Sequence, residues 1–235
     1  MTRKQTGTVR TCILTGILCA ATATAQSPGG RITGTILTAA GKPAAKHNVI
    51  VQVRPAKPGD PITPFTRTAT TAADGTFTLL GVPNGTFSIC PLPPDDTSVS
   101  PCNWSTEPRV TVASSKAVSV PPIRLLPSTD LYVRVNDTNG AFAAAKGKTL
   151  GDAISLAVRA PNGRMYPIPQ TASSAAGTDH HLHVPTGADL VFTAFSTQLS
   201  MTDAAGASIS KQSGMAASVN IPNGQAQHTV TINIH

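Results

Sequence analysis

The stretch between Arg31 and Pro91 constrains the fold most, because short alternating apolar and polar runs are separated there by turn residues. The run Val49–Val53 is strand-like, and Asp74-Gly75 and Asn84-Gly85 are turn signals. Asn or Asp before Gly tolerates the positive φ that tight hairpin turns require. Helical periodicity is almost absent from the chain. The sequence therefore predicts an all-β fold of antiparallel hairpins.

The order of these pieces resembles the carboxypeptidase regulatory-like family. That family has a Gly-x-Val strand, a Gly-x-Pro turn, a Val-rich strand, a Thr-x-x-Asp-Gly-x-Phe segment and a Pro-x-Gly-x-Tyr segment. The corresponding pieces here are Ile32–Leu37, Gly41–Pro43, Val49–Val53, Ala73–Phe77 and Gly81–Phe87. The resemblance implies a small transthyretin-like sandwich, as a rule without chemistry of its own, in a bacterial exported protein. Its firm part ends near Pro91, and the proline-rich insertion at 55–64 departs from the family pattern.

Residues 1–25 have the three parts of a secretory signal peptide. Arg3, Lys4 and Arg10 precede an apolar run at 12–21, and a small-residue cleavage site at 23–25 comes before Gln26. The run is much shorter than the roughly 20 residues that span a bilayer, and no later segment approaches that length. We expect a mature chain that begins at Gln26, has no transmembrane segment, and resides in the periplasm, at the cell surface or outside the cell.

The charge of the mature chain gives little support to nucleic-acid binding. Of the 18 Lys and Arg, three lie in the signal peptide, whereas all 11 acidic residues follow it, so the mature net charge is +4. The remaining basic residues form no run and have no aromatic residues interleaved with them, as a platform for stacking bases would require. We expect no nucleic-acid partner.

Cys90 and Cys102 are the two cysteines that remain in the mature chain. In an oxidising compartment they are expected to form a disulfide. The alternative is a metal or redox pair, but the spacing is not C-x-x-C and no second cysteine pair is present to match it.

Two consecutive antiparallel β-sandwich units, immunoglobulin-like or transthyretin-like, are predicted after the signal peptide at 26–127 and 128–235. Leu126–Asp130 is interpreted as a short hinge, and a new strand is predicted over Leu131–Val135. Strands are predicted, among others, over Asn48–Arg54, Asp189–Phe195 and Gln227–Ile234, and a hairpin around Pro161-Asn162-Gly163. The second unit is either another immunoglobulin-like sandwich, which we favour, or a partner sheet of the first.

Asp179, His180, His181 and His183 cluster within five residues. In a strand, His181 and His183 point to the same face because side chains alternate. Two imidazoles so placed can share a Zn or Cu ion if folding supplies a third ligand, with Asp179, His228 or His235 as candidates. The alternative is a polar strand face at the rim of a sheet, and otherwise no cofactor is expected.

Nine aromatic residues leave few rings for stacking on sugars. Trp104, two residues after Cys102, is the candidate ligand-binding ring, and packing against the disulfide is its alternative role. The chain has no Gly-x-Ser-x-Gly elbow, no His-Glu-x-x-His helix and no phosphate-cradling glycine loop, so we expect no enzymatic activity.

The leading hypothesis is an exported, non-catalytic β-sandwich protein that acts as a binding or structural module. Its ligand would be a carbohydrate, a cell-wall component or another exported protein, bound through loops on a rigid scaffold. The alternative is a periplasmic metal-binding protein or metalloenzyme that uses His180, His181 and His183. A third hypothesis is a role in a larger outer-membrane assembly, exerted through a partner.

Overall fold

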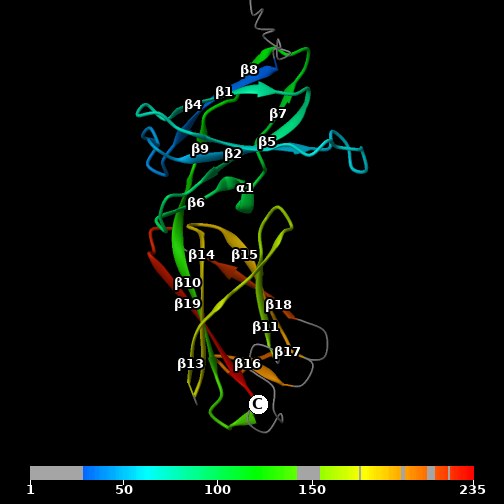
Figure 1. The fold of residues 1–235 in the computed structure, drawn as a ribbon. Helices are drawn as coiled ribbons and strands as arrows, with labels where there is room; N and C mark the ends of the chain where they lie inside the picture. Colours follow the sequence, from blue (N-terminus) through cyan, green and yellow to red (C-terminus); the bar gives the residue numbers. More distant parts are fainter. Residues whose placement is uncertain (1–28, 142–153, 175, 197–198, 211–214, 222) are drawn as a thin grey trace, which may run out of the picture.

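The computed structural model describes residues 29–141, 154–174, 176–196, 199–210, 215–221 and 223–235 (Figure 1). The predicted signal peptide lies outside the described residues. Nearly all regular structure is β, which confirms the predicted fold class; the one helix among the named elements is the single turn α1 (Pro101–Trp104). No helix in the described ranges is long and apolar enough to cross a membrane.

The N-terminal half forms a sandwich of two four-stranded sheets. One sheet contains β4 (Thr76–Val82), β1 (Gly30–Leu37) and β8 (Ala117–Ser119), with β9 (Ile123–Arg124) also paired to β1. The other contains β3 (Thr66–Thr70), β2 (Asn48–Arg54), β5 (Gly85–Leu92) and β7 (Arg109–Val112). Both sheets contribute to one core, here called the N-terminal core, whose fully buried members include Ile32, Ile36, Val49, Val51, Phe87 and Ile89.

The C-terminal half forms a second pair of sheets, below the first in Figure 1. The larger sheet has the order β13 (Gln170–Ser174), β14 (Gly177–Pro185), β10 (Leu126–Asn136), β19 (Gln227–Ile234), β16 (Met201–Asp203) and β17 (Ser208–Ser210), with β6 (Ser98–Val99) also paired to β10. The smaller sheet has the order β12 (Met165–Pro167), β11 (Ser155–Arg159), β15 (Asp189–Phe195) and β18 (Met215–Asn220). Their shared C-terminal core includes Leu131, Val133, Val135, Val158, Val184, Ile232 and Ile234, all fully buried.

The predicted hinge at Leu126–Asp130 is wrong, because these residues are the first part of β10. Leu126 pairs with Val99 of β6, and pairing with β14 begins at Ser128. Thr129 is fully buried and its hydroxyl donates a hydrogen bond of 2.8 Å to the Gln225 carbonyl. Pro127 and three small polar residues suggested a linker, but tertiary pairing extended the strand through them.

The strands predicted at 48–54, 189–195 and 227–234 are present with these bounds as β2, β15 and β19. β11 and β12 form the hairpin predicted around Asn162-Gly163. The strand β13 was missed because its sequence, Gln-Thr-Ala-Ser-Ser, has no apolar alternation, and all five residues are exposed at the sheet edge.

A segment between β5 and β7 connects the two halves. Val99 and Trp104 come from the N-terminal half of the sequence but belong to the C-terminal core. The β11–β12 hairpin holds α1 from the other side, since Asn162 Nδ2 donates to the Asn103 carbonyl at 2.8 Å and Arg164 Nη1 donates to the Cys102 carbonyl at 3.1 Å. The two cores are therefore bridged by more than the strand β10.

The predicted disulfide Cys90–Cys102 is present, with a Cα–Cα distance of 5.7 Å. It joins β5, whose buried residues lie in the N-terminal core, to α1, whose Trp104 lies in the C-terminal core. The intervening loop includes Asp96 and Thr97, whose carbonyls accept hydrogen bonds from Ser128 of β10 in the C-terminal sheet.

Candidate functional site

The outer face of the large C-terminal sheet is polar because residues alternate along β10 and β14. On β10, Leu131 and Val133 face the core, so Asp130 and Tyr132 face outward. The antiparallel register places Asp130 opposite His183 and Tyr132 opposite His181. Two neighbouring pairs on one sheet face thus bring an acid, two imidazoles and a phenol together.

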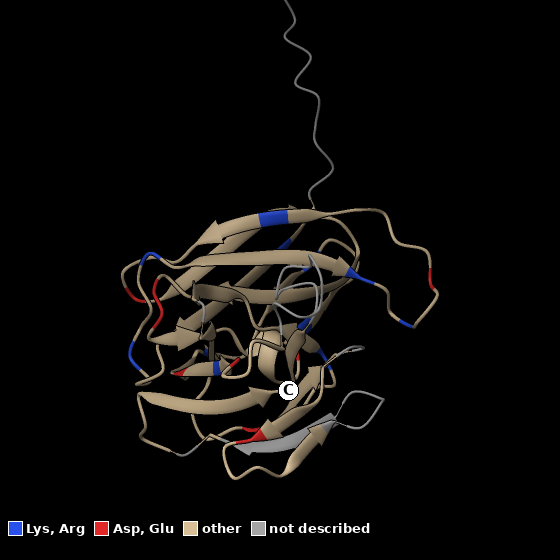
Figure 2. Ribbon diagram, turned by 90° about the horizontal axis from the view of Figure 1, so that it is seen from below, with Lys and Arg blue, Asp and Glu red and all other residues tan. Residues whose placement is uncertain are grey.

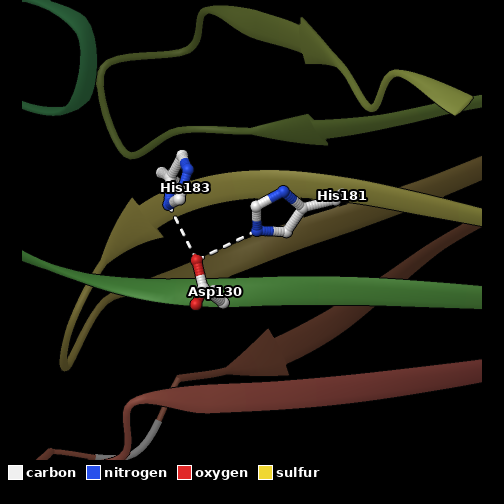
Figure 3. Close-up of side chains that lie close together, drawn as sticks. All are labelled: Asp130, His181 and His183. Carbon is white, nitrogen blue, oxygen red and sulfur yellow. Dashed lines mark hydrogen bonds and ion pairs between the residues drawn. The ribbon is translucent and has the colours of Figure 1, made fainter. Parts of the chain in front are cut away.

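Asp130 Oδ1 is the point where the two imidazoles converge (Figure 3). It lies 2.9 Å from His181 Nε2 and 2.8 Å from His183 Nδ1. The three ligand-type atoms all lie within 4.8 Å of one another. The rings of His181 and His183 meet edge to face at 4.6 Å, and Tyr132 stacks on His181 at the same centroid distance. The cluster is therefore held by ring contacts as well as by the approach of both imidazoles to one carboxylate oxygen.

His181 and His183 face Asp130 in different ways. His181 Nε2 donates a hydrogen bond to Asp130 Oδ1. The Nδ1 atom of His183 is buried and lacks hydrogen-bond geometry to any acceptor, although it is only 2.8 Å from the same oxygen. Buried polar atoms normally have a hydrogen-bond partner, so the lack of one at His183 Nδ1 calls for an explanation.

Asp96 lies on the opposite side of the His183 ring. Its Oδ1 is 3.3 Å from His183 Nε2, and its side chain is 84% exposed. Ser128 fixes the loop by donating its hydroxyl hydrogen to the Asp96 carbonyl, and the Ser128 N–H donates to the Thr97 carbonyl at 3.2 Å. His183 consequently has a carboxylate at each ring nitrogen.

A groove of about 550 Å³ lies over this cluster. Its lining residues come from four places in the chain, namely the disulfide loop, strand β10, strand β14 and the segment before β19; they are Asp96, Thr97, Ser128, Asp130, Tyr132, His181, His183 and Ala226. Nearly all are polar, and His181, His183 and Asp130 are partly buried. The groove can thus surround a small polar group or one end of a larger ligand.

His180 and Asp179 are not part of this cluster. His180 faces inward, where its Nδ1 lies 3.2 Å from the Ile168 carbonyl oxygen and its Nε2 lies 3.0 Å from Thr178 Oγ1. Burial lowers the pKa of His180, although the Ile168 carbonyl and the charge of Asp179 oppose this effect. Asp179 shares the outer face but forms an ion pair of 2.7 Å with Arg134. Of the predicted set, only His181 and His183 converge.

The two other candidate ligands, His228 and His235, also lie outside the cluster. His228 is opposite Leu131 in the β10–β19 register, hence on the inward-facing row, and His235 contacts Thr202.

Trp104 is buried, with 5% of its surface exposed. Its ring packs on Tyr166 at a centroid distance of 4.6 Å within the C-terminal core. It therefore presents no open face for stacking on a sugar, and its described contacts are those of a core residue.

Of the groove residues, only His181 and His183 were predicted from the sequence, and the missed ones include Asp130, Tyr132 and Asp96. Asp130 falls in the predicted hinge, and Asp96 falls in the disulfide loop. The available signal was the alternation Asp130-Leu-Tyr-Val-Arg134, which places Asp130 and Tyr132 on one face once the strand is extended backward by one residue. No local signal identifies β14 as the partner strand.

Basic and acidic residues are distributed over several strands and loops (Figure 2). The Arg54–Glu107 pair is the most enclosed ion pair described, since the Glu107 side chain is 8% exposed. Glu107 falls between α1 and β7 in the chain, and neither residue of the pair lines the groove.

No family model and no curated protein matches the chain, so its resemblance to the carboxypeptidase regulatory-like family stays a prediction. Among solved structures, the minor pilin GBS52 of Streptococcus agalactiae is 15% identical over 88% of this chain and 95% of its own, with a TM-score of 0.41. The major pilin SpaD of Corynebacterium diphtheriae is 8% identical over 82% and 64%, with a TM-score of 0.32.

The Bacillus anthracis TIE protein is 13% identical over 88% of this chain, with a TM-score of 0.31, and the chain spans about a third (34%) of its length. At TM-scores below 0.5, these similarities carry no argument about function. A function for the chain has to be inferred from the arrangement of side chains in the groove.

Proposed function

We propose that the chain is an exported, non-catalytic β-sandwich binding module, and that the groove over Asp130, Tyr132, His181 and His183 is its recognition site. The observation that carries this proposal is the convergence of the disulfide loop with β10 and β14 on one polar groove of about 550 Å³. Ligand sites are typically concave and contain a few convergent polar groups on a rigid scaffold.

The expected ligand is a carbohydrate, a cell-wall component or a polar segment of another exported protein. Carboxylate, imidazole and hydroxyl groups offer both donors and acceptors, which suits a hydroxyl-rich or amide-rich ligand. Export rests on the signal-peptide pattern of residues 1–25, and the compartment would be the periplasm, the cell surface or the medium. A bacterial source and the carboxypeptidase regulatory-like relationship belong to the same proposal.

Thermal unfolding of the mature chain tests this function, because a ligand that binds only the native state raises the midpoint by mass action. Soluble polysaccharides and cell-wall fragments form the panel. Ala226→Arg would fill the groove with a long charged side chain at an exposed position and should abolish any rise. Ala204→Arg, the same change on the exposed β16–β17 turn, is the matched control and should retain the rise.

A rise that survives Ala226→Arg would place the ligand elsewhere and contradict the assignment of the groove. If no member of the panel raises the unfolding midpoint of the native chain or of the Ala204→Arg control, carbohydrates and cell-wall fragments are excluded as ligands. Another exported protein is then the ligand to test.

A further inference from the structure

We propose that Asp130, His181 and His183 form a binding site for one divalent transition metal ion of the Zn²⁺ or Cu²⁺ class, with a coordination position left open to the groove. This inference deepens the proposed function and rests on it, because it assigns one ligand of the same groove. The site differs from the one expected from the sequence, since Asp130 replaces His180 and Asp179.

The donor set has the right chemistry for such an ion. Imidazole nitrogen suits Zn²⁺ and Cu²⁺, and a carboxylate oxygen commonly completes a three-residue set. Sites with three protein ligands keep a further position for water or for a group of the bound molecule. The partial exposure of all three residues leaves such a position accessible from the groove.

The distances are compatible with an ion after small movements. Ligand atoms at about 2.05 Å from a tetrahedral ion lie about 3.3 Å from one another. Asp130 Oδ1 is 2.9 Å from His181 Nε2 and 2.8 Å from His183 Nδ1. Each of these two carboxylate–imidazole pairs would open by about half an ångström, and the two imidazole nitrogens already lie within 4.8 Å of each other.

The two ring nitrogens of His183 can take the two roles that a metal-bound histidine needs. Asp96 Oδ1, 3.3 Å from Nε2, is close enough to accept the Nε2 hydrogen, and this leaves the Nδ1 lone pair beside Asp130 but not aimed at its Oδ1. A ligating histidine characteristically donates its other N–H to a carboxylate, which fixes the tautomer and the ring orientation. The buried Nδ1 without a hydrogen bond is what this tautomer produces when no ion is bound.

His181 requires one change. Its Nε2–H now donates to Asp130, so metal binding moves that hydrogen to Nδ1 or releases it. Stacking on Tyr132 keeps the ring in place while this occurs. The bound ion would then lie between Asp130 Oδ1 and the two imidazole nitrogens, which now contact that oxygen directly.

The test is calorimetric titration of Zn²⁺ into the mature chain, purified without a His tag and stripped with chelator, with Co²⁺ absorption spectra as a second readout of coordination. One ion per chain is expected to bind. His183→Gln, His181→Gln and Asp130→Asn should each lose this binding, while Asp96→Asn should weaken it by roughly 10–100-fold. Asp179→Asn and His235→Gln, a carboxylate and an imidazole outside the site, should bind as the native chain does.

Failure of the folded native chain to bind Zn²⁺ or Co²⁺, or equal binding by the Asp130 and His183 variants, would overturn the metal site. Circular dichroism of every variant separates these outcomes from loss of fold. A midpoint rise with a glycan that Ala226→Arg abolishes, in a chain that binds no metal, would refute this inference and leave the proposed function intact.

Discussion

His183 Nδ1 lies 2.8 Å from Asp130 Oδ1, across an antiparallel strand pair that sets the two residues directly opposite each other. The contact lacks hydrogen-bond geometry, and the nitrogen is buried. Because Asp96 approaches the other ring nitrogen, the imidazole is enclosed by two carboxylates. This arrangement makes the outer face of β10 and β14, rather than a loop tip, the chemically distinctive part of the molecule.

Gly177 is required by the close approach of β14 to β10. Its φ is +138°, and a Cβ there would lie 1.8 Å from the Val135 carbonyl oxygen. Gly177→Ala should therefore destabilise the chain by roughly 3 kcal/mol or more, since the backbone must move. Gly163→Ala, at φ +83° with nothing within 4 Å of the added carbon, should cost about 1 kcal/mol. Denaturant unfolding of both variants measures the difference, and equal losses would contradict the steric explanation.

The disulfide should stabilise the chain and organise the groove. Breaking Cys90–Cys102, by Cys90→Ala with Cys102→Ala, should cost about 3 kcal/mol in the chain-entropy description. The loop that brings Asp96 to His183 is then released, so groove ligands should bind more weakly even where the sandwich stays folded. Unfolding of the native chain with and without reductant measures the first effect. Ligand binding unchanged in the folded double variant would show that the loop needs no tether.

Trp104 is the only tryptophan and reports on the C-terminal core. Its emission should be that of a buried indole and should shift to longer wavelength on unfolding. Trp104→Ala should cost roughly 3–5 kcal/mol, because the Tyr166 ring and the neighbouring core lose their packing partner. Trp104→Phe, which retains an aromatic ring, should cost clearly less. A native emission typical of solvent-exposed tryptophan would contradict the burial.

Glu107 should make the protein sensitive to acid. Burial raises the pKa of Glu107, but the Arg54 hydrogen bond and the charges of Arg54, Arg109 and Arg164 outweigh it, so the pKa lies below its ordinary value. The unfolded chain therefore takes up this proton first as the pH falls. The stability from Glu107 is complete above about pH 4.5 and declines as the pH falls through the lowered value.

Glu107→Gln should consequently lower the free energy of unfolding by about 1–2 kcal/mol at pH 7, and the difference from the native chain should shrink under acidic conditions. Asp179→Asn is the matched control, since its pair with Arg134 is well exposed and should contribute under about 1 kcal/mol. Unfolding curves from pH 7 to pH 2.5 give the comparison. A difference that grows toward low pH would reverse the assigned sign.

Most of what could be predicted from the sequence follows from the local alternation of apolar and polar residues. Runs such as Asn48–Arg54 and Asp189–Phe195 alternate strongly enough for their bounds to be predicted, and Asn162-Gly163 marks the turn of a real hairpin. The same alternation placed His181 and His183 on one face. The spacing and compartment also indicated the Cys90–Cys102 bridge, which the structure contains.

Tertiary structure decided what lies opposite these faces. Asp130 belongs to the site because β10 pairs with β14, and Asp96 because a disulfide-closed loop reaches the same sheet. Trp104, which follows that loop, is buried in the C-terminal core. The direction of a side chain in a strand follows from local alternation along the backbone, so it can be predicted from the sequence. Strand pairing depends on burial and hydrogen bonding between segments far apart in the sequence, and these contacts exist only in the folded chain.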